Sequence, residues 1–491
     1  MSLKSSAVQA VIWTLVRFWG GQGISLIVFA VLARFVEPSE FGLIALANIF
    51  VAFIGLNLTV GFSEVIIQSK ELKSEELNTL FYSNIIIGLI MIAAICFLSP
   101  QVAQFYKNDD LTWVIRAISP NLLVASLTSI PDAILRHQLR FKVISLRTLV
   151  AGLTSGVVGI FLAVSGYGIW SLIAQLTVSN VVQLLIIWNA VSWKPGFKVS
   201  SFSYFEESLR TEFSMIGARS LDFIVQRTPA LLIGYMLGVV ALGYYTVAFK
   251  LIQALIMLLV VVVSQVAFPM LSKISDDLDK LRNTYLVVLK SMSMITFSCF
   301  LVVSAISSEI ILVTFGDQWR ESIRIMNILS FIGASQSIIF LNRSVVLSLG
   351  KIKLRFFLSF INTFFSLISI FVAAQHGKLI YVILSMVLSS YVFLLIDMVV
   401  VHRILRTRAK SLIYAIIPPI LVSTALLGSA WVFNYWLQAL DFTPTYRLVA
   451  LFFGISPLWL SLVFIFDRNT FMEALEYFNK EYLAKFFARK T

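Results

Sequence analysis

The sequence predicts an all-α polytopic membrane protein with about 14 transmembrane helices, and three observations support this fold class. The chain has 491 residues, of which 59% are hydrophobic and only 13% are charged, whereas soluble domains carry about 25% charged residues. The mean hydropathy is +0.91. Apolar runs of about 20 residues, the length at which a helix crosses the hydrocarbon core of a bilayer, recur along the chain.

Fourteen apolar segments have spanning length. They are predicted at roughly 10–32, 40–62, 79–98, 112–133, 147–165, 168–190, 213–237, 241–268, 286–306, 323–349, 356–375, 379–401, 411–434 and 447–466. The first is expected to be a spanning helix and not a cleaved signal, because it has full length and a second span follows at once. Residues 470–491 place Phe and Leu side chains on one stripe, which predicts an amphipathic cytoplasmic helix or a partly ordered tail.

Positive charges are concentrated on one side of the predicted spans. The connections on that side hold 26 Lys and Arg residues, and those on the other side hold five. Cytoplasmic loops carry such an excess of positive charge, so both termini are expected in the cytoplasm. The formal net charge of +13 therefore indicates membrane topology and not a nucleic-acid partner.

Composition also bounds the chemistry. Cys96 and Cys299 lie inside apolar segments and are expected to be small apolar side chains, and the histidines His137, His376 and His402 are isolated in the sequence. We therefore expect no metal site and no cofactor. No connection exceeds about 25 residues, which leaves no room for a soluble catalytic domain. No phosphate-binding P-loop motif is present.

The chain repeats itself. The sequence LARFVEPSEFGLIALA at 32–47 is echoed by GYMLGVVALGYYTVA at 234–248, and FYKNDDLTWVIRAIS at 105–119 by FGDQWRESIRIMNILS at 315–330. The first spans of both repeats start on the cytoplasmic side, so two parallel six-helix lobes are predicted, with a transport site between them. The predicted divisions are residues 1–200, 201–410, a pair of extra helices at 411–467 and the tail at 468–491.

Charged residues inside the predicted spans are the candidate site. They are Arg17, Arg219, Arg227, Lys250 and Arg343. Ionisable groups in membrane spans are costly and usually functional, and guanidinium groups suit phosphate, so a cavity for an anionic substrate is predicted. The repeat relates Arg17 to a position one residue from Arg219, so both are expected to face one cavity.

Three carboxylates, Asp132, Asp222 and Asp397, are candidates for ion coupling. Other roles stay open for these charges. Arg17 could extend to the inner interface, Asp222 could neutralise Arg219, and Arg343, Asp132 and Asp397 lie near enough to span ends to be solvated.

Seven motifs in order resemble the polysaccharide-transporter family of Wzx-type flippases, within the multidrug/oligosaccharidyl-lipid/polysaccharide exporter superfamily. They are LARFVEPSEFGL (32–43), VGFSEVIIQ (60–68), ILRHQLRFK (134–142), GYGIWSL (166–172), LLIGYMLGVVALGYYTVAFKL (231–251), AFPMLSKISDD (267–277) and FGDQW (315–319). One departure concerns Pro229, which stands where relatives commonly carry an acidic residue. An ion-coupling role of that acid does not transfer to this chain.

The resemblance implies a flippase of the bacterial inner membrane that works by alternating access. Its substrate would be an undecaprenyl-diphosphate-linked oligosaccharide moved from the cytoplasmic to the periplasmic leaflet. A polysaccharide polymerase and a chain-length regulator would be partners. The alternatives are a multidrug or cation antiporter, which favours an acidic interior, and a membrane glycosyltransferase or polymerase, which needs catalytic carboxylates on a long outer loop.

Overall fold

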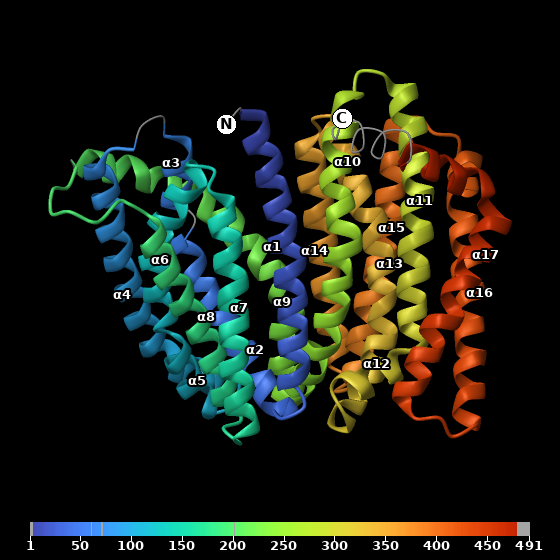
Figure 1. The fold of residues 1–491 in the computed structure, drawn as a ribbon, viewed down its shortest axis with the longest axis horizontal. Coiled ribbons are helices and arrows are strands. Elements are labelled where there is room, and N and C mark those ends of the chain that lie inside the picture. The colour runs from blue at the N-terminus through green and yellow to red at the C-terminus, as the bar shows by residue number, and fades with distance from the viewer. Residues whose placement is uncertain (1–2, 60, 70–71, 201, 479–491) are drawn as a thin grey trace, which may run out of the picture. The chain divides into compact units, whose positions relative to one another are not determined.

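The chain folds into helices grouped in two compact units. The computed structural model describes residues 3–59, 61–69, 72–200 and 202–478, and these residues contain no strand. Unit 1 comprises Met1–Thr246 and unit 2 comprises Val247–Thr491. Figure 1 shows unit 1 in blue to green and unit 2 in yellow-green to red, with long helices side by side in each. The lobe boundaries at 200 and 410 stay predictions.

Unit 1 is built around α7. Its helices are α1 (Leu3–Leu32), α2 (Pro38–Thr59), α3 (Gly61–Gln68), α4 (Ser74–Phe105), α5 (Asp110–Ile118), α6 (Asn121–His137), α7 (Phe141–Val164), α8 (Ile169–Ala190) and most of α9 (Phe202–Ile256). The helix α7 packs against both α1 and α8, and α6 packs against α4, α3 and α8. The predicted fourth span is divided into α5 and α6 at Pro120, whose missing N–H interrupts the helical hydrogen bonds.

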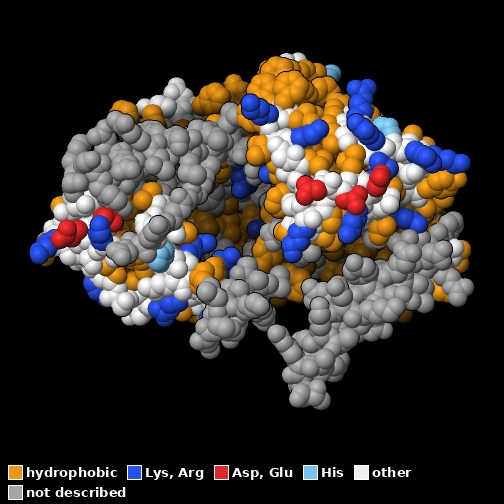
Figure 2. Space-filling view, turned by 90° about the horizontal axis from the view of Figure 1, so that it is seen from above, with side chains coloured by type: hydrophobic (Ala, Val, Ile, Leu, Met, Phe, Trp, Pro, Cys, Tyr) orange, Lys and Arg blue, Asp and Glu red, His pale blue; other side chains and the backbone are white. Residues whose placement is uncertain are grey.

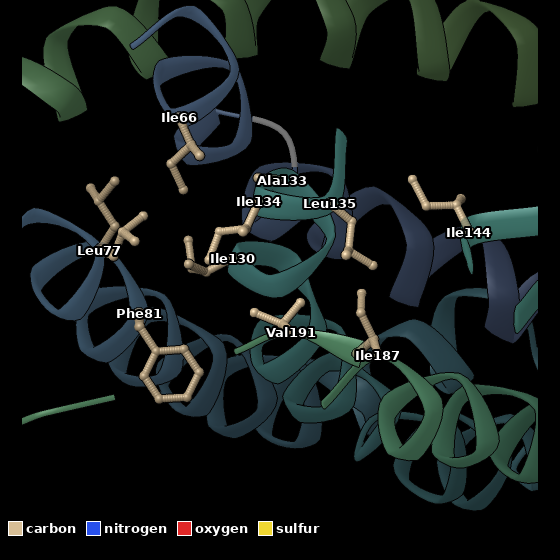
Figure 3. Packing of buried hydrophobic residues seen from close by; sticks show 11 residues of the cluster. Ile66, Leu77, Phe81, Ile130, Ala133, Ile134, Leu135, Ile144, Ile187 and Val191 are labelled. Carbon is tan, nitrogen blue, oxygen red and sulfur yellow. The ribbon is translucent and has the colours of Figure 1, made fainter. Parts of the chain in front are cut away.

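A buried apolar cluster joins α3, α4, α6, α7 and α8 of unit 1. Figure 3 shows Ile66, Phe81, Ile134 and Ile187 converging from these helices, and all four are almost fully buried. The cluster includes Ala133 and Ile144, so it lies next to the charged residues described below. This packing fixes the ends of α6 and α7 against α8.

Unit 2 is built around α11 and α13. Its helices are the end of α9, the π-helical η1 (Met257–Val261), α10 (Val262–Lys273), α11 (Leu278–Ala305), α12 (Ser307–Thr314), η2 (Asp317–Trp319), α13 (Arg320–Ser348), α14 (Ile352–Ala374), α15 (Leu379–Leu405), α16 (Ala409–Ala439) and α17 (Pro444–Phe478). The helix α11 packs against α13 and α16, and α15 packs against α13 and α14. The first part of the predicted tail continues α17 to Phe478, and residues 479–491 lie outside the described residues.

The helices have the length and apolar character that the sequence predicts for membrane spans, but fewer than 14 of them are counted in the part of the chain that the structure describes. Within the described residues, 12 helices are long and apolar enough to cross a membrane, and Val16–Leu32 is a shorter apolar helix. The stretch Phe223–Val260 counts once, although α9 bends at Gly238, where φ is 86° and ψ is 173°. The count of 14 stays a prediction. Phe97 and Phe453 are more than 70% exposed, as expected of lipid-facing side chains.

The internal repeat is visible in the backbone. Three pairs of residues with positive φ occupy matching connections: Lys107 and Gly316, Leu139 and Gly350, and Gly166 and Gly377. The separations are 209, 211 and 211 residues. Residues with positive φ therefore recur at nearly equal separations in the connections of the two halves. This indicates that the two halves share one order of turns.

Two glycines within unit 1 make reciprocal contacts. A Cβ atom on Gly42 of α2 would lie 1.8 Å from the carbonyl oxygen of Val239, and a Cβ on Gly243 would lie 1.9 Å from that of Pro38. The two glycines are separated by 201 residues, and so are Pro38 and Val239, which is the offset that aligns the two repeated sequences. The starts of α2 and of the second part of α9 therefore approach each other so closely that only glycine fits.

Lys and Arg gather on the face seen in Figure 2, where they outnumber Asp and Glu. Exposed Lys351, Arg406, Arg408 and Lys410 lie beside the ends of α13 and α15. This is the pattern expected of a cytoplasmic face. The orientation of the termini stays a prediction.

Candidate functional site

A charged cluster in unit 1 centres on Asp132 of α6. Its Oδ1 lies 2.8 Å from Nη1 of Arg147 on α7, and its Oδ2 accepts a hydrogen bond from Nε of Arg136, one turn further along α6. The side chains of Asp132 and Arg147 are only 20% and 10% exposed. Charge-assisted hydrogen bonds of this kind are stronger than neutral ones, so the carboxylate is held in one orientation.

The helix α1 brings Arg17 to the same cluster. The hydroxyl of Ser145 on α7 donates to the carbonyl oxygen of Trp13 at 2.7 Å, and Nζ of Lys142 lies 5.6 Å from the Trp13 ring centre. One turn further along α1, Arg17 is half-buried and within electrostatic reach of Asp132, Arg136 and Arg147. Three guanidinium groups surround one carboxylate, so the cluster is net positive.

A polar cavity opens beside this cluster. Its volume is about 210 Å³, and its lining residues come from α3, α6, α7 and α8: Ser63, Val124, Ala125, Thr128, Ser129, Asp132, Arg147, Asn180 and Gln183. The Nε atom of Arg147 is buried and has no hydrogen-bond partner among the described residues. The amide of Asn180 is oriented by its donation to Oδ1 of Asn121 at 3.0 Å.

The geometry of a helical hairpin explains why Asp132 meets Arg147. The helices α6 and α7 are antiparallel neighbours joined by a turn in which Leu139 has a φ of 55°. Asp132 stands seven residues before Leu139 and Arg147 eight residues after it, and at 1.5 Å per residue both lie at one depth. Equal distance from a predicted turn is the signal in the sequence that could have revealed this pair.

Unit 2 contains a second pair built in the same way. Asp397 of α15 is fully buried, and its Oδ1 lies 3.5 Å from Nη1 of Arg355 on α14, whose side chain is 14% exposed. These residues stand 20 after and 22 before Gly377 in the intervening turn. Asn342 lies beside the carboxylate and accepts a hydrogen bond from the buried Tyr285 hydroxyl at 2.8 Å. Asp397 was near enough to a predicted span end to be solvated, but its full burial excludes this alternative.

The remaining predicted residues are spread over both units. Arg227 of α9 is exposed, with its guanidinium 5.7 Å from the Phe223 ring centre. In unit 2, Lys250 of α9 is partly buried, and Arg343 of α13 is exposed and within electrostatic reach of Arg355. The side chains of Arg219 and Asp222 lie outside the described residues, so their place in a cavity stays a prediction.

Three arginines at or next to the ends of predicted spans are largely buried. They are Arg147, Arg355 and Arg447. Arg447 of α17 lies 2.9 Å from Oε1 of the fully buried Glu309 of α12, and Asn434 of α16 donates to Oε2 of Glu309 at 3.0 Å. Hydropathy windows place such residues at span ends, where charge is expected in water, but tertiary packing covers them. This last group attaches α16 and α17 to α12.

Metal chemistry finds no support among the described residues, where no three His, Cys, Asp or Glu side chains come together. The cluster at Asp132 instead offers guanidinium, amide and hydroxyl groups. These groups bind anions and hydroxyl-rich molecules through hydrogen bonds. Such an arrangement suits binding and release of a polar molecule inside an apolar unit.

A family model described as "Polysaccharide biosynthesis protein" matches residues 31–324. The chain belongs to this family. The match covers Asp132, Arg136 and Arg147, the residues that line the cavity and both reciprocal glycines, whereas Arg17 precedes it. It confirms, together with the relatives below, the resemblance read from the seven motifs and the expectation of a transport protein.

Two curated relatives match along most of their length. The chain is 24% identical to the teichuronic acid biosynthesis protein TuaB of Bacillus subtilis (strain 168), with 87% of this chain and 88% of TuaB covered. It is 24% identical to the lipopolysaccharide biosynthesis protein WzxC of Escherichia coli (strain K12), with the same coverage. The fold resembles that of the lipid II flippase MurJ in an inward closed conformation, with a TM-score of 0.71, 17% identity and coverage of 94% of this chain and 99% of MurJ.

Proposed function

We propose that this protein is a flippase that moves lipid-diphosphate-linked polysaccharide repeat units from the cytoplasmic to the periplasmic leaflet of a bacterial inner membrane. The observation that carries the proposal is a polar cavity beside a net positive cluster, inside an apolar helical unit of a member of the polysaccharide biosynthesis family. The names of WzxC and TuaB as biosynthesis proteins of surface polysaccharides support it. Transport by alternating access is part of the proposal.

The lipid carrier would be undecaprenyl diphosphate, whose negative charge suits guanidinium groups. Arg17 is the best-placed described candidate for the diphosphate, because it lies beside Arg136 and Arg147 and carries no direct ion pair with Asp132. Arg219, Arg227, Lys250 and Arg343 complete the proposed set of basic residues. A polysaccharide polymerase and a chain-length regulator are proposed partners.

Membrane potential is the proposed source of energy. The inside of the membrane is negative, so outward movement of a diphosphate is downhill by about 2.3 kcal/mol per charge and 100 mV, or about 4.6 kcal/mol for two charges. The carboxylate of Asp132 accepts a hydrogen bond from Arg136 and lies 2.8 Å from Nη1 of Arg147, so both of its oxygens are already next to guanidinium groups. Ion coupling through Asp222 or Asp397 is the alternative.

The test uses proteoliposomes loaded with lipid-linked saccharides from the producing cells, with a fluorescent or enzymatic reporter of the outer leaflet. Wild-type protein is expected to move the lipid, Arg17→Ala to lose most transport, and Arg17→Lys to keep part, because lysine retains the charge but not the forked donors. Arg320→Ala is the matched control, since Arg320 forms an exposed ion pair with Asp317 in a connection.

Two results would refute the proposal. Absence of flipping by the wild-type protein under every gradient would exclude a flippase. Efflux of organic cations in place of lipid transport would favour the antiporter alternative, which the net positive cluster at Asp132 makes the weaker candidate. A potassium–valinomycin potential without proton or sodium gradients separates the energy sources. Flipping that ignores the potential and follows an ion gradient would transfer the coupling role to the carboxylates.

A further inference from the structure

The cavity of unit 1 has a lining that differs from the charged cluster beside it. Nine described residues line the cavity, and only two of these are charged: Asp132 and Arg147, which neutralise each other across 2.8 Å. The others are hydroxyl, amide and small apolar side chains. The cavity wall is therefore polar but neutral, whereas the excess positive charge resides on Arg17 and Arg136, which do not line it.

We propose that this cavity binds one neutral sugar ring of the transported saccharide. The inference rests on the proposed function and adds a specific place for the sugar, separate from the residues that attract the diphosphate. A diphosphate inside the cavity would meet the carboxylate of Asp132, and like charges at short range in a site of low dielectric repel strongly. A hydroxyl-rich neutral ring meets no such penalty.

The lining offers the hydrogen-bonding groups that vicinal sugar hydroxyls require. Asn180 and Gln183 stand three residues apart on α8, which places both amides on one helical face. Each amide provides donors and an acceptor, the Asp132 carboxylate accepts, and the guanidinium of Arg147 donates. A sugar hydroxyl can donate and accept at once, so neighbouring hydroxyls can bridge these groups.

A buried donor of one lining residue lacks a hydrogen-bond partner, as do Nε of Arg355 and Nε of Arg447 elsewhere in the described residues. Nε of Arg147 makes no hydrogen bond among the described residues, although nine-tenths of the side chain is buried. Leaving such a donor unsatisfied is costly, and a ligand hydroxyl in the cavity would remove that cost. Asp132 fixes the guanidinium, and Asn121 fixes the Asn180 amide, so the site is preorganised for binding.

Size limits the ligand. The cavity measures about 210 Å³, below the range of roughly 300–1,000 Å³ typical of pockets for drug-sized ligands. A complete oligosaccharide therefore does not fit, whereas a single pyranose ring does. The cavity would distinguish repeat units by one residue of the saccharide.

The transport test compares two lipids in the same proteoliposomes: undecaprenyl diphosphate without sugar, and the lipid-linked saccharide extracted from producing cells. The variants are Asn180→Leu and Gln183→Met, which keep side-chain volume but remove the amide. The rate ratio of saccharide-bearing to bare lipid is expected to fall about tenfold in each, as for loss of a hydrogen bond to a buried polar partner. Asn189→Leu is the control, since Asn189 is an exposed amide on the same helix.

A second measurement does not depend on transport. In a full-length chain with Cys96 and Cys299 replaced by serine, Thr128→Cys reports access to the cavity by its labelling rate with a small thiol reagent. Neutral methyl glycosides are expected to slow labelling, and inorganic pyrophosphate is not.

The outcomes separate this inference from the proposed function. Wild-type protein that moves neither lipid would defeat the proposed function, while glycoside protection of position 128 would still support the sugar site. Rate ratios in both amide variants equal to that of wild type would overturn the sugar site. Protection by pyrophosphate and not by glycosides would also overturn it and would make the cavity an anion site.

Discussion

Replacement of Gly42 by alanine tests the close approach of α2 and α9 in unit 1. The added Cβ would lie 1.8 Å from the Val239 carbonyl oxygen, and the backbone of Val239 supplies all three of its nearest atoms. A carbon and a carbonyl oxygen approach to about 3.3–3.6 Å at best. The two helices would therefore have to separate by about 1.5 Å, because a backbone carbonyl cannot rotate aside as a flexible side chain can.

The expected loss of stability follows from these distances. Overpacking of this size costs about 1–3 kcal/mol, and alanine returns up to about 1 kcal/mol through its higher helix propensity. We expect a net loss of about 1–2 kcal/mol for Gly42→Ala and a similar loss for Gly243→Ala, whose Cβ would lie 1.9 Å from the Pro38 oxygen. Separation of the helices relieves both contacts together, so the double variant should lose less than the sum.

Thermal unfolding in detergent, followed by tryptophan fluorescence or by a dye that fluoresces on reaction with Cys96 and Cys299, measures the change. The control is Gly23→Ala in α1, where a Cβ meets no atom within 4 Å and stability should rise or stay constant. The reasoning is refuted if Gly42→Ala is as stable as that control. Full additivity in the double variant would show that the two contacts are independent and not part of one interface.

Three further predictions concern the buried ion pairs and the topology. Asp397→Asn should destabilise the protein by about 3–5 kcal/mol because it leaves Arg355 buried without a counter-charge; a midpoint of thermal unfolding like that of wild type would contradict this. Glu309→Gln should likewise leave Arg447 buried without a counter-charge and increase hydrogen exchange in α16 and α17. Unchanged hydrogen exchange in these helices would contradict this prediction. Asn108→Cys, in the connection between α4 and α5, should react with an impermeant thiol reagent from outside the cell, and labelling only after permeabilisation would reverse the predicted orientation.

Much of the fold could be predicted because a helix that crosses a lipid bilayer must be long and apolar. Each such helix can be recognised from its own stretch of sequence. The short helix α3 and the break at Pro120 were not predicted, because neither changes the hydropathy of its surroundings. The bend at Gly238 was not predicted either, because it is a change of backbone conformation at one residue, where φ is 86°. The repeat was detectable because glycines and aromatic residues mark its turns in the same order in both halves, at offsets of 201 and 210 residues.

The candidate site could be predicted only in part. Arg17 and Asp132 stood out as charges within apolar runs, and the structure brings both to one cluster. Arg147 stands at the end of a predicted span and gave no signal, because hydropathy along a single segment does not reveal the helix packed beside it. Asn180 and Gln183 gave no signal at all, since amides are common in helices and only the packing of α6, α7 and α8 makes them line a cavity.

The two hairpin ion pairs are not counterparts in the repeat, because Asp132 and Arg147 flank the turn at Leu139, which matches Gly350, whereas Asp397 and Arg355 flank the turn at Gly377, which matches Gly166. Asp132 with Arg147 and Asp397 with Arg355 each join the helices of a hairpin at equal distance from its turn. In unit 1 the pair borders a cavity, so its guanidinium is available to a ligand. In unit 2 the carboxylate is fully enclosed, with Asn342 and Arg355 beside it. A buried pair without access exchanges nothing with solvent, and breaking it costs stability. Substitution at Asp397 should therefore alter folding, whereas substitution of the amides around Asp132 should alter which saccharide is moved.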